Sequence, residues 1–564
     1  MANRFILPAD TNWKQITAWI ITALIVAYGI YQAIQLAWVG DDAFISFRYA
    51  HNLIHGQGLV FNAGETVEGY TNFLWTIIIA GGLALGFDPV IFSYILSITA
   101  FVITISIFIY LATRLQNKSS KLIIPITTIA LLVHHDFLTY ATSGLETSLV
   151  TMLVSLGFAI LLTAKTSKSF WWAGVVLVGA ILTRPDSLIF YVMALPYILM
   201  TSTTRLKSLL WFVIPVLLIY LPYWVWRYSY YGYPFTNTYY AKSAYLAYYS
   251  QGLIYLWLFV KTYYVILLYP AAIIIGLYGI IKRKVKLTES LPDKILLLSL
   301  LLVPPYIFYV VRTGGDFMFA RFFIPILPLI LFTIESAGKS LLTKTYLRIA
   351  LAILIIGGVY FRFNQLNQPA KVIQGIVDER TFYPDRAVEL ARINGANLKK
   401  YLGDKDVVVG FYGSKAMTVY YSELPMAIEC HTGLTDEYIA HLPLDKRGRP
   451  GHEKMAPHEY LYRRNVNFIL KHTTELPKDR TRIISFNGSI AHIMTYDRAL
   501  MNQLKGIPEV KFIDYEVVLD RFITEIDSFS NTQVLDMLRL SKDYYFDHND
   551  DPARLQAILS HLNQ

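Results

Sequence analysis

The stretch WVGDDAFISFRYAHNLIHGQGLVFNAGETVEGYTN, from Trp38 to Asn72, begins where the first long apolar run of the chain, Ile16 to Val39, ends. The sequence changes there from apolar residues to a dense polar segment that opens with two adjacent carboxylates, Asp41 and Asp42. An acidic pair just outside a membrane-spanning segment lies where water and lipid headgroups meet. This position predicts that the pair acts on a substrate at the level of the headgroups.

The composition places the whole chain among polytopic membrane proteins. Of its 564 residues, 55% are apolar and only 16% are charged, and the mean hydropathy is positive. A set of soluble domains would need more polar surface than this composition supplies. Recurring apolar runs predict about eleven membrane spans, several of which reach the roughly 20 residues that cross the hydrocarbon core. The runs are Ile16 to Val39, Val90 to Leu111, Leu122 to Val133, Leu145 to Ala164, Trp171 to Thr183, Leu188 to Met200, Leu209 to Trp226, Leu253 to Ile281, Ile295 to Val311, Phe322 to Ile334 and Ile349 to Phe361.

Lysine and arginine fall at alternate loops between these runs, as the positive-inside rule expects. They are Arg4, Lys14, Arg114, Lys118, Lys121, Lys165, Lys168, Arg205, Lys207, Lys282, Arg283, Lys284, Lys286, Lys339, Lys344 and Arg348. We therefore expect a cytoplasmic N-terminus in a bacterial inner membrane, with the first outer loop (residues 40–72) and everything after Phe361 facing the periplasm. The net charge of +10 then serves orientation, and no nucleic-acid partner is needed to explain it.

The apolar stretch from Phe73 to Phe87 does not fit this count. It is short for a span, and a full span here would place the basic loop from Arg114 to Lys121 on the wrong side. We predict a re-entrant or interfacial helix. The first apolar run is expected to remain as an anchor, because it continues into the acidic loop and not into a small-residue cleavage site.

Residues 1–361 therefore form the predicted transmembrane catalytic domain, and residues 362–564 a separate α/β domain on the outer face. Short β-rich runs in this second part alternate with amphipathic helical stretches. The expected strands and helices are Val407 to Val409, Phe468 to Leu470, Ile483 to Phe486, Arg386 to Tyr401 and Thr532 to Leu540. Cys430 is the only cysteine, so neither an intrachain disulfide nor a cysteine-rich zinc site is possible.

The first outer loop holds four carboxylates, Asp41, Asp42, Glu65 and Glu68, as well as polar candidates for substrate binding. Carboxylates this close to a bilayer are costly unless they are solvated, paired or metal-bound, which suggests an aqueous cavity. They are oxygen ligands of the kind that Mg²⁺, Mn²⁺ or Ca²⁺ takes, but their spacing does not specify a metal site. The alternative is a solvated loop with Arg48 as counter-ion. The spacing of Phe44, Phe47, Arg48 and Leu53 indicates a short helix lying on the membrane, and the further binding candidates here are Arg48, Tyr70 and Asn72.

Two shorter motifs follow, SGLET at Ser143 to Thr147 and TRPDS at Thr183 to Ser187. The first places Glu146 at the opening of a span. The second interrupts two apolar runs with Arg184 and Asp186, because Pro185 breaks the helix and leaves backbone groups to be satisfied inside the protein or in a wet cleft. Glu146, Arg184 and Asp186 are binding candidates. For Arg184 and Asp186 the alternative is that they only neutralise each other.

Three further clusters carry the remaining candidates. WRYSYYGYPFTNTYYAK, from Trp226 to Lys242, combines aromatic rings with hydrogen-bonding groups, which suits either a sugar site or an interfacial aromatic belt. RTGGDFMFARFFIPILP, from Arg312 to Pro328, offers planar guanidinium groups for a phosphate beside a carboxylate and two glycines. KRGRPGHEK, from Lys446 to Lys454, is either a binding loop or an ordinary solvated loop. The candidates are Asn237, Tyr240, Lys242, Arg312, Asp316, Arg321, His452, Glu453 and Lys454.

The order of these motifs, DDAFISFRYAHNL, GLVFNAGETVEGYTN, SGLET, TRPD, YYGYPFTNTYYAK, GGDFMFARFFIPILP and RPGHEK, resembles the membrane arabinofuranosyltransferases of the GT-C glycosyltransferase class. These include the terminal mycobacterial enzyme that caps arabinan and Gram-negative relatives that decorate pilin. The resemblance covers about Trp38 to Arg321 and touches the outer domain mainly at GLTD and RPGHEK. The long first-loop motif is specific, whereas SGLET or TRPD alone would be weak.

The resemblance implies transfer of a pentofuranose, most simply D-arabinofuranose, from a polyprenyl phosphate to an acceptor hydroxyl on the outer face. An acidic residue of the first outer loop serves as base or site organiser in this class, and the matching positions are Asp41 and Asp42. The departing phosphate needs cations, and Arg184, Lys242, Arg312 and Arg321 are available. Which aspartate acts, whether one is instead a nucleophile, and whether the acceptor is arabinan, lipopolysaccharide or pilin stay open.

Two alternatives remain at this point. One is the same architecture with an aminoarabinosyl or hexosyl polyprenyl phosphate as donor, acting on lipopolysaccharide. The other is a lipid or glycan transporter that uses the acidic loop as a gate. A transporter would be expected to show matched halves and charges near mid-span, whereas this sequence has no duplication and crowds its polar residues on one face.

Overall fold

The computed structural model describes residues 13–115, 125–283, 288–342, 344–362, 371–444, 446–471, 477 and 479–563. Of the predicted basic loops, Arg4, Lys118, Lys121, Lys284 and Lys286 lie outside the described residues. The chain divides into two compact units. The first comprises residues 1–43, 71–234 and 245–383, and the second comprises residues 44–70, 235–244 and 384–564. This division concerns compactness alone, so the predicted domain boundary after residue 361 stays a prediction.

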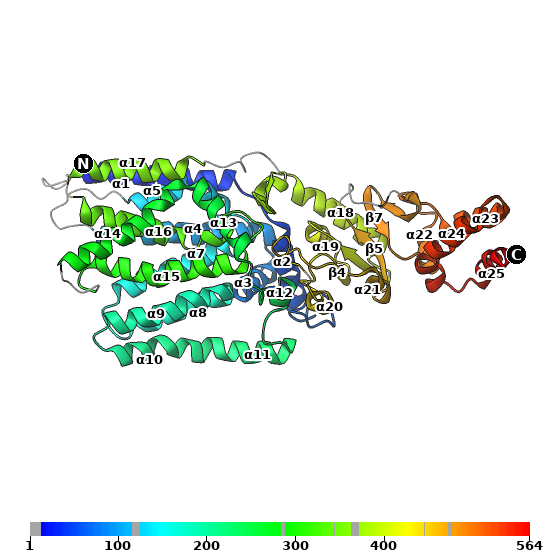
Figure 1. The fold of residues 1–564 in the computed structure, drawn as a ribbon, viewed down its shortest axis with the longest axis horizontal. Helices are drawn as coiled ribbons and strands as arrows, with labels where there is room; N and C mark the ends of the chain where they lie inside the picture. The colour runs from blue at the N-terminus through cyan, green and yellow to red at the C-terminus, as the bar shows by residue number, and fades with distance from the viewer. Residues whose placement is uncertain are drawn as a thin grey trace, which may run out of the picture. The chain divides into compact units, whose positions relative to one another are not determined.

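The first unit is a bundle of helices (Figure 1). Its helices are α1 (Trp13–Gln35), α3 (Phe73–Ala84), α4 (Pro89–Arg114), α5 (Ile126–Val133), α6 (His135–Thr139), α7 (Thr147–Thr163), α8 (Ser169–Thr183), α9 (Leu188–Thr201), α10 (Arg205–Pro215), α11 (Leu221–Tyr231), α13 (Tyr249–Thr262), α14 (Leu268–Arg283), α15 (Leu291–Thr313), α16 (Leu327–Leu341) and α17 (Thr345–Tyr360). A small antiparallel pair, β1 (Val372–Ile373) and β2 (Ile376–Val377), follows them.

Four stretches of the described chain are long and apolar enough to cross a membrane by length and composition. They are Pro89–Arg114, Arg205–Tyr231, Tyr264–Arg283 and Leu291–Thr313. The other apolar helices are shorter, among them α3, which coincides with the predicted re-entrant or interfacial segment. The membrane class is thus supported, whereas the predicted number of spans and the outer-face placement stay predictions.

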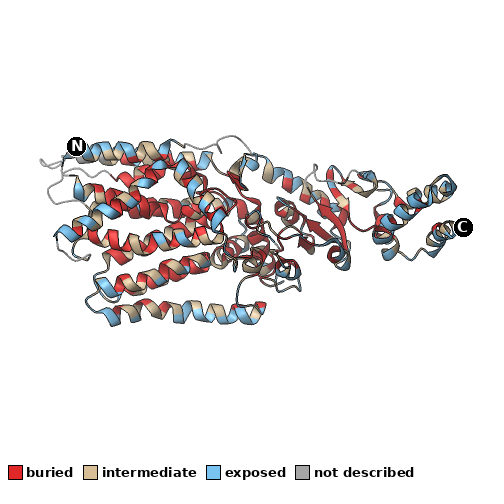
Figure 2. Cartoon of the chain, viewed as in Figure 1, coloured by how far each residue is buried: buried red, intermediate tan, exposed pale blue. Residues whose placement is uncertain are grey.

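Burial separates the interior helices of the bundle from its surface (Figure 2). In the most apolar part of the stretch from Leu291 to Thr313, 56% of the residues are buried, against 17% in the stretch from Arg205 to Tyr231. An apolar helix that leaves most of its side chains exposed is suited to lipid, because water would penalise that surface. The helices α10 and α11 therefore have the character of a lipid-facing edge.

The second unit contains a six-stranded sheet in the order β4-β3-β5-β7-β6-β8. Its strands are β3 (Val408–Phe411), β4 (Met426–Glu429), β5 (Val466–Leu470), β6 (Ile483–Phe486), β7 (Ser489–Ile493) and β8 (Val510–Phe512). The strand β3 pairs in parallel with both β4 and β5, while the remaining pairs are antiparallel. Every residue of β5 is buried, as expected for a central strand covered on both faces. Cys430 is buried and unbridged, in agreement with the sequence.

Helices flank this sheet, and part of the first outer loop belongs to the same unit. They are the later turns of α2 (Asp41–Ile54), α12 (Asn237–Ala241), α18 (Ala387–Leu402), α19 (Ala416–Ser422), α20 (Glu437–His441), α21 (His458–Arg463), α22 (Arg498–Leu504), α23 (Tyr515–Thr524), α24 (Asn531–Tyr544) and α25 (Pro552–Leu562). The strands and helices predicted for the C-terminal part match β3, β5, β6, α18 and α24. The α/β character of this part is therefore confirmed.

Candidate active site

The acidic pair occupies the first turn of α2. Asp41 is buried, with 5% of its surface exposed, while Asp42 is half-buried. Unpaired backbone N–H groups at a helix start carry partial positive charge, which favours carboxylates at this position. The two side chains thus start from equivalent backbone positions but in different environments, and Asp42 is the more accessible of the two.

The turn before α2 is held in place by the segment that carries SGLET. Trp38 donates its indole N–H to the carbonyl oxygen of Thr139 at 3.0 Å, and the N–H of Gly40 donates to the carbonyl oxygen of Ser143 at 3.1 Å. Gly144 has a positive φ of +74°, and a Cβ there would come within 2.4 Å of Val39 Cγ2. Only glycine accommodates both the backbone conformation and the close approach, so this motif serves to position the acidic pair.

A tyrosine from the end of the first unit, Tyr383, lies against this turn. Its ring is 5.7 Å from that of Trp38, and its hydroxyl donates to Glu379 Oε1 at 3.3 Å. Burial, and then the negative charges of Glu379, Asp41 and Asp42, raise the pKa of Tyr383 well above its ordinary value. The phenol therefore stays protonated and remains a hydrogen-bond donor beside the carboxylates.

Beside the acidic pair lies a network of buried charges centred on Glu146, which precedes α7. Arg321 Nη2 contacts Glu146 Oε1 at 3.2 Å, and Arg184 Nη1 contacts the same oxygen at 3.5 Å. Asn72 donates to Glu146 Oε2 at 3.0 Å. Burial alone would raise the pKa of Glu146, but Arg321 and Arg184 bring it below its ordinary value. Glu146 is therefore ionised and holds both guanidinium groups in fixed positions.

Two more carboxylates complete this network. Asp316 Oδ2 lies 3.5 Å from Arg321 Nη1, and Asp186 accepts from Arg184 Nε and Nη2 at 3.1 and 2.9 Å. Burial lowers the pKa of Arg321. The carboxylates of Asp316, Glu146 and, more weakly, Asp42 raise it, and the net result is a pKa above the ordinary value. Arg184 and Asp186 do neutralise each other, as the alternative interpretation held. Arg321 is likewise shared between two carboxylates, and it also lies within electrostatic reach of Asp42.

Two other arginines of the first unit have guanidinium nitrogens that pair with no carboxylate among the described residues. Arg312 lies in the last turn of α15 and is half-buried. Arg380 donates its Nε to the carbonyl oxygen of Leu36 at 2.9 Å, and in the described part of the chain its terminal nitrogens form no ion pair. Cations that are not already neutralised by the protein are the ones best placed to bind an anionic ligand.

Arg380 lines a cavity of about 510 Å³ beyond the end of α5, between residues of α1 and the segment after α17. Leu36, Leu132 and Leu138 give it apolar walls, while Gln32, His135, Arg362 and Asp378 supply polar groups. Tyr28 and Tyr360 also line it, and their side chains are 55% and 63% exposed. The cavity therefore combines apolar walls and exposed tyrosines with Arg380, whose guanidinium pairs with no carboxylate among the described residues, and this suits a lipid that carries a phosphate.

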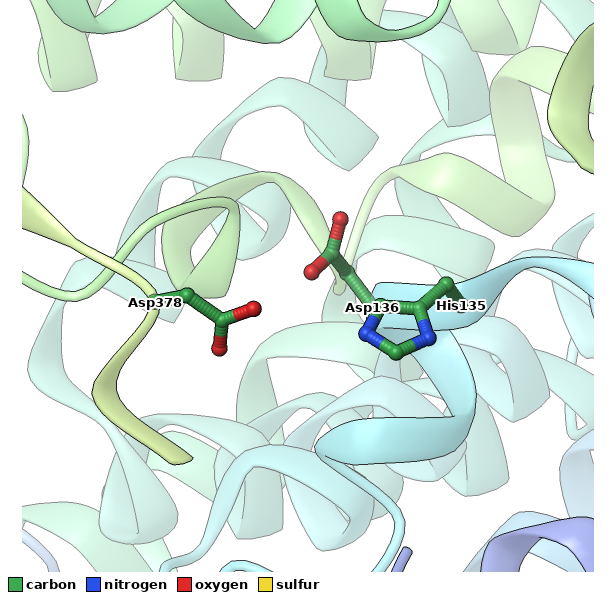
Figure 3. Close-up of side chains that lie close together, drawn as sticks. All are labelled: His135, Asp136 and Asp378. Carbon is green, nitrogen blue, oxygen red and sulfur yellow. The ribbon is translucent and has the colours of Figure 1, made fainter. Parts of the chain in front are cut away.

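Three side chains in and beside this cavity have the spacing of metal ligands. His135 and Asp136 of α6 approach Asp378, with ligand atoms within 4.8 Å of one another, and Figure 3 shows the two carboxylates facing each other. Arg362, however, bridges Asp136 Oδ1 and Asp378 Oδ2 at 2.8 Å each. Its guanidinium already binds an oxygen of each carboxylate, so a metal ion here would have to compete with Arg362 for both aspartates.

Among the described residues, this is the group found to have metal-ligand spacing, and it contains none of the carboxylates for which the sequence suggested a metal. Those carboxylates were Asp41, Asp42, Glu65 and Glu68. The predicted divalent cation stays a prediction.

In the second unit, Arg48 has a different kind of environment from the arginines above. It donates to the carbonyl oxygens of Phe61 at 2.7 Å and Leu424 at 2.8 Å, and to Asn62 Oδ1 at 3.3 Å. Burial lowers its pKa to about 10. The predicted helix around Arg48 is present, but Phe44 and Phe47 are fully buried against protein, with Tyr420 beside them. The expectation of a helix lying on the membrane is therefore wrong, because its apolar face packs into the α/β unit.

The other first-loop candidates in this unit also make contacts within the fold. Glu65 pairs with Arg464 and accepts from Asn62 Nδ2 at 2.9 Å. Glu68 is buried, and its carbonyl oxygen accepts from the N–H of Asn237 at 3.0 Å. Tyr70 is buried, with its ring 4.8 Å from that of Tyr49. These contacts favour a structural role for Glu65 and Tyr70.

The aromatic cluster and the GHEK motif meet in the same unit. Asn237 donates to the carbonyl oxygens of Gly433 and Leu434 at 2.8 Å each, and Lys454 donates to those of Tyr240 at 3.0 Å and Ala440. Burial lowers the pKa of Lys454. Both side chains are thus engaged by backbone carbonyls, which makes them clamps between chain segments.

Lys242, His452 and Glu453 complete this cluster. Glu453 Oε1 accepts from Arg447 Nε at 2.7 Å and from the N–H of Gly448 at 2.8 Å. Burial, and then the charge of Arg449, lower the pKa of His452 to about 3. The half-buried Lys242 is a weaker influence in the same direction. His452 is therefore neutral throughout the physiological pH range, and its loop is ordered by Glu453.

Sequence comparison identifies the relatives of this chain. Over 407 residues it is 26% identical to a terminal β-(1→2)-arabinofuranosyltransferase of Corynebacterium glutamicum, and over 423 residues it is 26% identical to the protein of the same name from Mycobacterium tuberculosis. The chain is thus similar in sequence to two terminal arabinofuranosyltransferases. The similarity covers 66% and 65% of the present chain but 59% and 66% of those two proteins, less than two thirds of the length of each. No protein-family model matches the chain.

The resemblance drawn from the sequence motifs is thereby confirmed. The structure brings together six of the predicted polar residues beside α2 in one network. They are Asn72, Glu146, Arg184, Asp186, Asp316 and Arg321. The candidates Arg48, Glu65, Asn237, Tyr240, Glu453 and Lys454 instead make structural contacts inside the second unit.

The sequence did not single out three residues that lie near the acidic pair or the cavity: Glu379, Arg380 and Tyr383. They belong to a segment that was assigned to the outer domain because it follows the last apolar run. The segment packs into the first unit through the N–H of Phe319, which donates to the carbonyl oxygen of Val377 at 2.9 Å. The run DERTFYP, from Asp378 to Pro384, was the available sign, since it concentrates charged and aromatic residues early in the segment that follows the last predicted span.

Proposed function

We propose that the protein is a membrane glycosyltransferase that transfers D-arabinofuranose from a polyprenyl phosphate to a hydroxyl group of an envelope glycan or glycoprotein. The reaction would take place on the periplasmic side of a bacterial inner membrane. The similarity to named arabinofuranosyltransferases supports the sugar. The observation that carries the proposal is the position of Asp42, half-buried at the start of α2 and within electrostatic reach of Arg321.

In the proposed reaction, Asp42 accepts the proton of the acceptor hydroxyl. The hydroxyl oxygen forms a bond to the anomeric carbon while the bond from that carbon to the phosphate oxygen breaks, and the polyprenyl phosphate leaves with the electron pair. Asp41, which is more buried, orients the turn, and Tyr383 donates a hydrogen bond within the same group of carboxylates. No nucleotide is required, because the lipid phosphate already activates the sugar.

The second carboxylate also permits a two-step route. In that route one aspartate attacks the anomeric carbon and is then displaced by the acceptor hydroxyl, so that the original configuration returns. The anomeric configuration of the product relative to the donor distinguishes the routes, because one displacement inverts it and two displacements retain it.

The departing phosphate is assigned to cations of the first unit. Arg321 is rigidly held but shares its charge with Asp316 and Glu146, whereas Arg312 and the terminal nitrogens of Arg380 pair with no carboxylate among the described residues. The cavity that Arg380 lines has exposed tyrosines at its rim, and Arg380 binds the carbonyl oxygen of Leu36, shortly before the acidic pair. We therefore assign the lipid phosphate to this cavity, with the sugar directed toward Asp42 and Arg321.

The test is incubation of the purified protein in lipid nanodiscs with radiolabelled polyprenyl-phospho-arabinofuranose and a glycan acceptor. Parallel reactions contain aminoarabinosyl and hexosyl polyprenyl phosphates, and NMR of the isolated product gives the anomeric configuration. We expect the wild type to transfer arabinofuranose, and we expect this transfer to disappear in both Asp41→Asn and Asp42→Asn. Preferential use of another sugar would overturn the donor assignment, and full activity of both variants would overturn the role of the acidic pair.

A further inference from the structure

A second cavity lies in the first unit, among the N-terminal end of α15 and neighbouring parts of α14 and α16. Its volume is about 350 Å³. The polar residues that line it include Lys282, Arg283, Ser290, Thr333, Ser336 and Ser340. None of these residues takes part in the proposed transfer. The question is what a polar cavity between apolar helices holds.

The cavity offers positive charge in a fixed arrangement. Arg283 donates Nε to the carbonyl oxygen of Gly279 at 3.1 Å and Nη2 to Asp293 Oδ1 at 2.9 Å, so its guanidinium is held at the wall. Lys282 pairs with no carboxylate among the described residues. With one aspartate against two cations, the lining carries a net positive charge and favours an anion.

A hydroxyl group in the wall has no partner. Ser336 is 2% exposed, and its Oγ makes no hydrogen bond within the described part of the chain. A serine in a helix commonly donates to the carbonyl oxygen one turn earlier, as Thr333 does to Leu329 at 2.8 Å. Leaving a buried hydroxyl unsatisfied costs free energy, so Ser336 is suited to an oxygen-bearing ligand in this cavity.

The surroundings of the cavity suit acyl chains. On α14 the side chains of Ile274 and Ile281 are 67% and 73% exposed, which gives a strongly apolar face. Gly279, in the cavity wall, has nothing within 4 Å of the position a Cβ would take. That face lies on the far side of α14 from Gly276 and Gly279, but Leu341, which lines the cavity, is 42% exposed and gives an apolar contact where the tail of a ligand would leave.

The position of the cavity separates it from the candidate active site. It lies at the first turns of α15, and Arg312 lies in the last turn of that 23-residue helix. At 1.5 Å per residue, α15 measures about 34 Å, close to the thickness of a hydrocarbon core. The basic loops predict that this end of the bundle faces the cytoplasm, where anionic lipids bind basic pockets between helices.

We propose that this cavity binds the phosphate of an anionic phospholipid from the leaflet opposite the active site. Lys282 and Arg283 contact the phosphate oxygens, Ser336 donates its hydroxyl hydrogen to one of them, and the acyl chains leave past Leu341. The lipid thus joins α14, α15 and α16 at one end. The proposal goes beyond the sugar transfer and does not depend on it, because its test measures binding and stability alone.

The test uses the full-length protein in nanodiscs of phosphatidylcholine with increasing fractions of phosphatidylglycerol, and follows thermal unfolding. Phosphatidylglycerol is expected to raise the unfolding temperature in a saturable manner. Lys282→Gln should require a roughly five-fold higher fraction of phosphatidylglycerol for half of that shift, and Ser336→Ala should weaken the response in the same direction. Lys207→Gln removes the same charge from another basic loop outside the cavity, and is expected to respond as the wild type does.

Two results would overturn the proposal. An equal loss of response in Lys207→Gln and Lys282→Gln would mean that surface charge alone accounts for the effect. A full shift produced by inorganic phosphate in pure phosphatidylcholine would assign the cavity to a free anion. If Lys282→Gln fails to fold, Ser336→Ala decides, since an unchanged response in that variant contradicts contact between the lipid and Ser336.

Discussion

Arg321 and Arg48 are both buried arginines near the first outer loop, yet their partners differ in kind. Arg321 lies between the carboxylates of Glu146 and Asp316, which raise its pKa. Arg48 is surrounded by carbonyl oxygens, and burial lowers its pKa to about 10. A carboxylate partner can be exchanged for an anionic ligand without loss of charge balance, whereas carbonyl groups bound by a buried arginine have no replacement donor.

The kind of partner therefore separates binding arginines from structural ones. The partners of Arg321 belong to one charged network beside the acidic pair, so changes there should alter the reaction. The partners of Arg48 are backbone atoms of the sheet region, so changes there should alter the stability of the fold. The following experiments test each side of this difference, beginning with the largest expected effect.

Replacing Asp42 by asparagine should reduce transfer by about 10²–10⁴-fold, because the side chain keeps its size but no longer accepts the hydroxyl proton. The initial rate of labelled arabinofuranose transfer measures the loss. The thermal unfolding temperature should remain that of the wild type. Asp536→Asn, the same change on an exposed position of α24, is the matched control and should keep full activity. A nearly active Asp42→Asn variant would remove the reason for treating Arg321 as part of the site.

Arg321→Lys should lower kcat/KM for the donor by roughly 10- to 100-fold. It keeps the positive charge but cannot contact Glu146 and Asp316 in the planar arrangement of a guanidinium group. Steady-state kinetics with varied donor concentration provide the measurement. An unchanged kcat/KM would show that the carboxylate network only supports the fold, which would erase the functional contrast with Arg48.

Arg48→Lys should instead destabilise the protein by about 2–3 kcal/mol, because several carbonyl oxygens lose a donor. Urea-induced unfolding of the full-length protein measures the change in the free energy of unfolding, with hydrogen exchange in β3 and β4 as the probe. The activity of the fraction that remains folded should equal that of the wild type. Arg521→Lys, on the surface of α23, should change neither quantity. A kinetic defect in stably folded Arg48→Lys would contradict the structural assignment.

Arg380→Gln should raise the donor concentration needed for half-maximal rate by roughly ten-fold, in line with the loss of one charge-assisted contact to phosphate. The maximal rate should change less, since Arg380 is assigned to the lipid phosphate and not to the proton transfer. The dependence on acceptor concentration serves as the internal control. A variant with altered acceptor dependence but normal donor dependence would place the phosphate elsewhere.

The smallest expected effect concerns pH and His452. Its pKa of about 3 lies below the ordinary 6.5, so the unfolded chain takes up this proton first as the pH falls. The contribution of His452 to the free energy of unfolding is therefore complete above pH 6.5 and is lost as the pH falls toward 3. Over this range the free energy of unfolding changes by at most about 1.4 kcal/mol per pH unit because of His452. Unfolding measured at pH 7, 6 and 5 should show a smaller slope in His452→Gln. A steeper slope in that variant would reverse the assigned sign.

Local sequence features predicted much of the fold. Long apolar runs indicated the helical bundle, and the buried strand β5 was recognisable from its apolar residues. The start of α2 at Asp41 also followed from the sharp change in polarity. The pairing of Arg184 with Asp186 could be predicted from the sequence because the two residues are only two positions apart, on either side of Pro185. In each case the decisive interaction is local in the chain, so its pattern is visible in a short window.

The remainder depended on contacts between distant segments. The bond from Phe319 to Val377 brings Glu379 and Tyr383 into the first unit, and it uses backbone atoms, which leave no trace in the sequence. The same is true of Arg48, Asn237 and Lys454, which donate to the carbonyl oxygens of Leu424, Gly433 and Tyr240, all distant in the chain. A polar residue that binds backbone therefore has the same sequence appearance as one that binds substrate.

The bond from Arg48 to the carbonyl oxygen of Leu424 has a consequence for synthesis. The two residues are 376 positions apart. At about 5–20 residues per second, the ribosome needs roughly 20–75 s after making Arg48 before it makes Leu424. The helix that begins with the acidic pair is thus translated long before its acceptor at Leu424 exists. Its final packing belongs to the last part of biogenesis, and truncations upstream of Leu424 should leave this helix accessible to proteases.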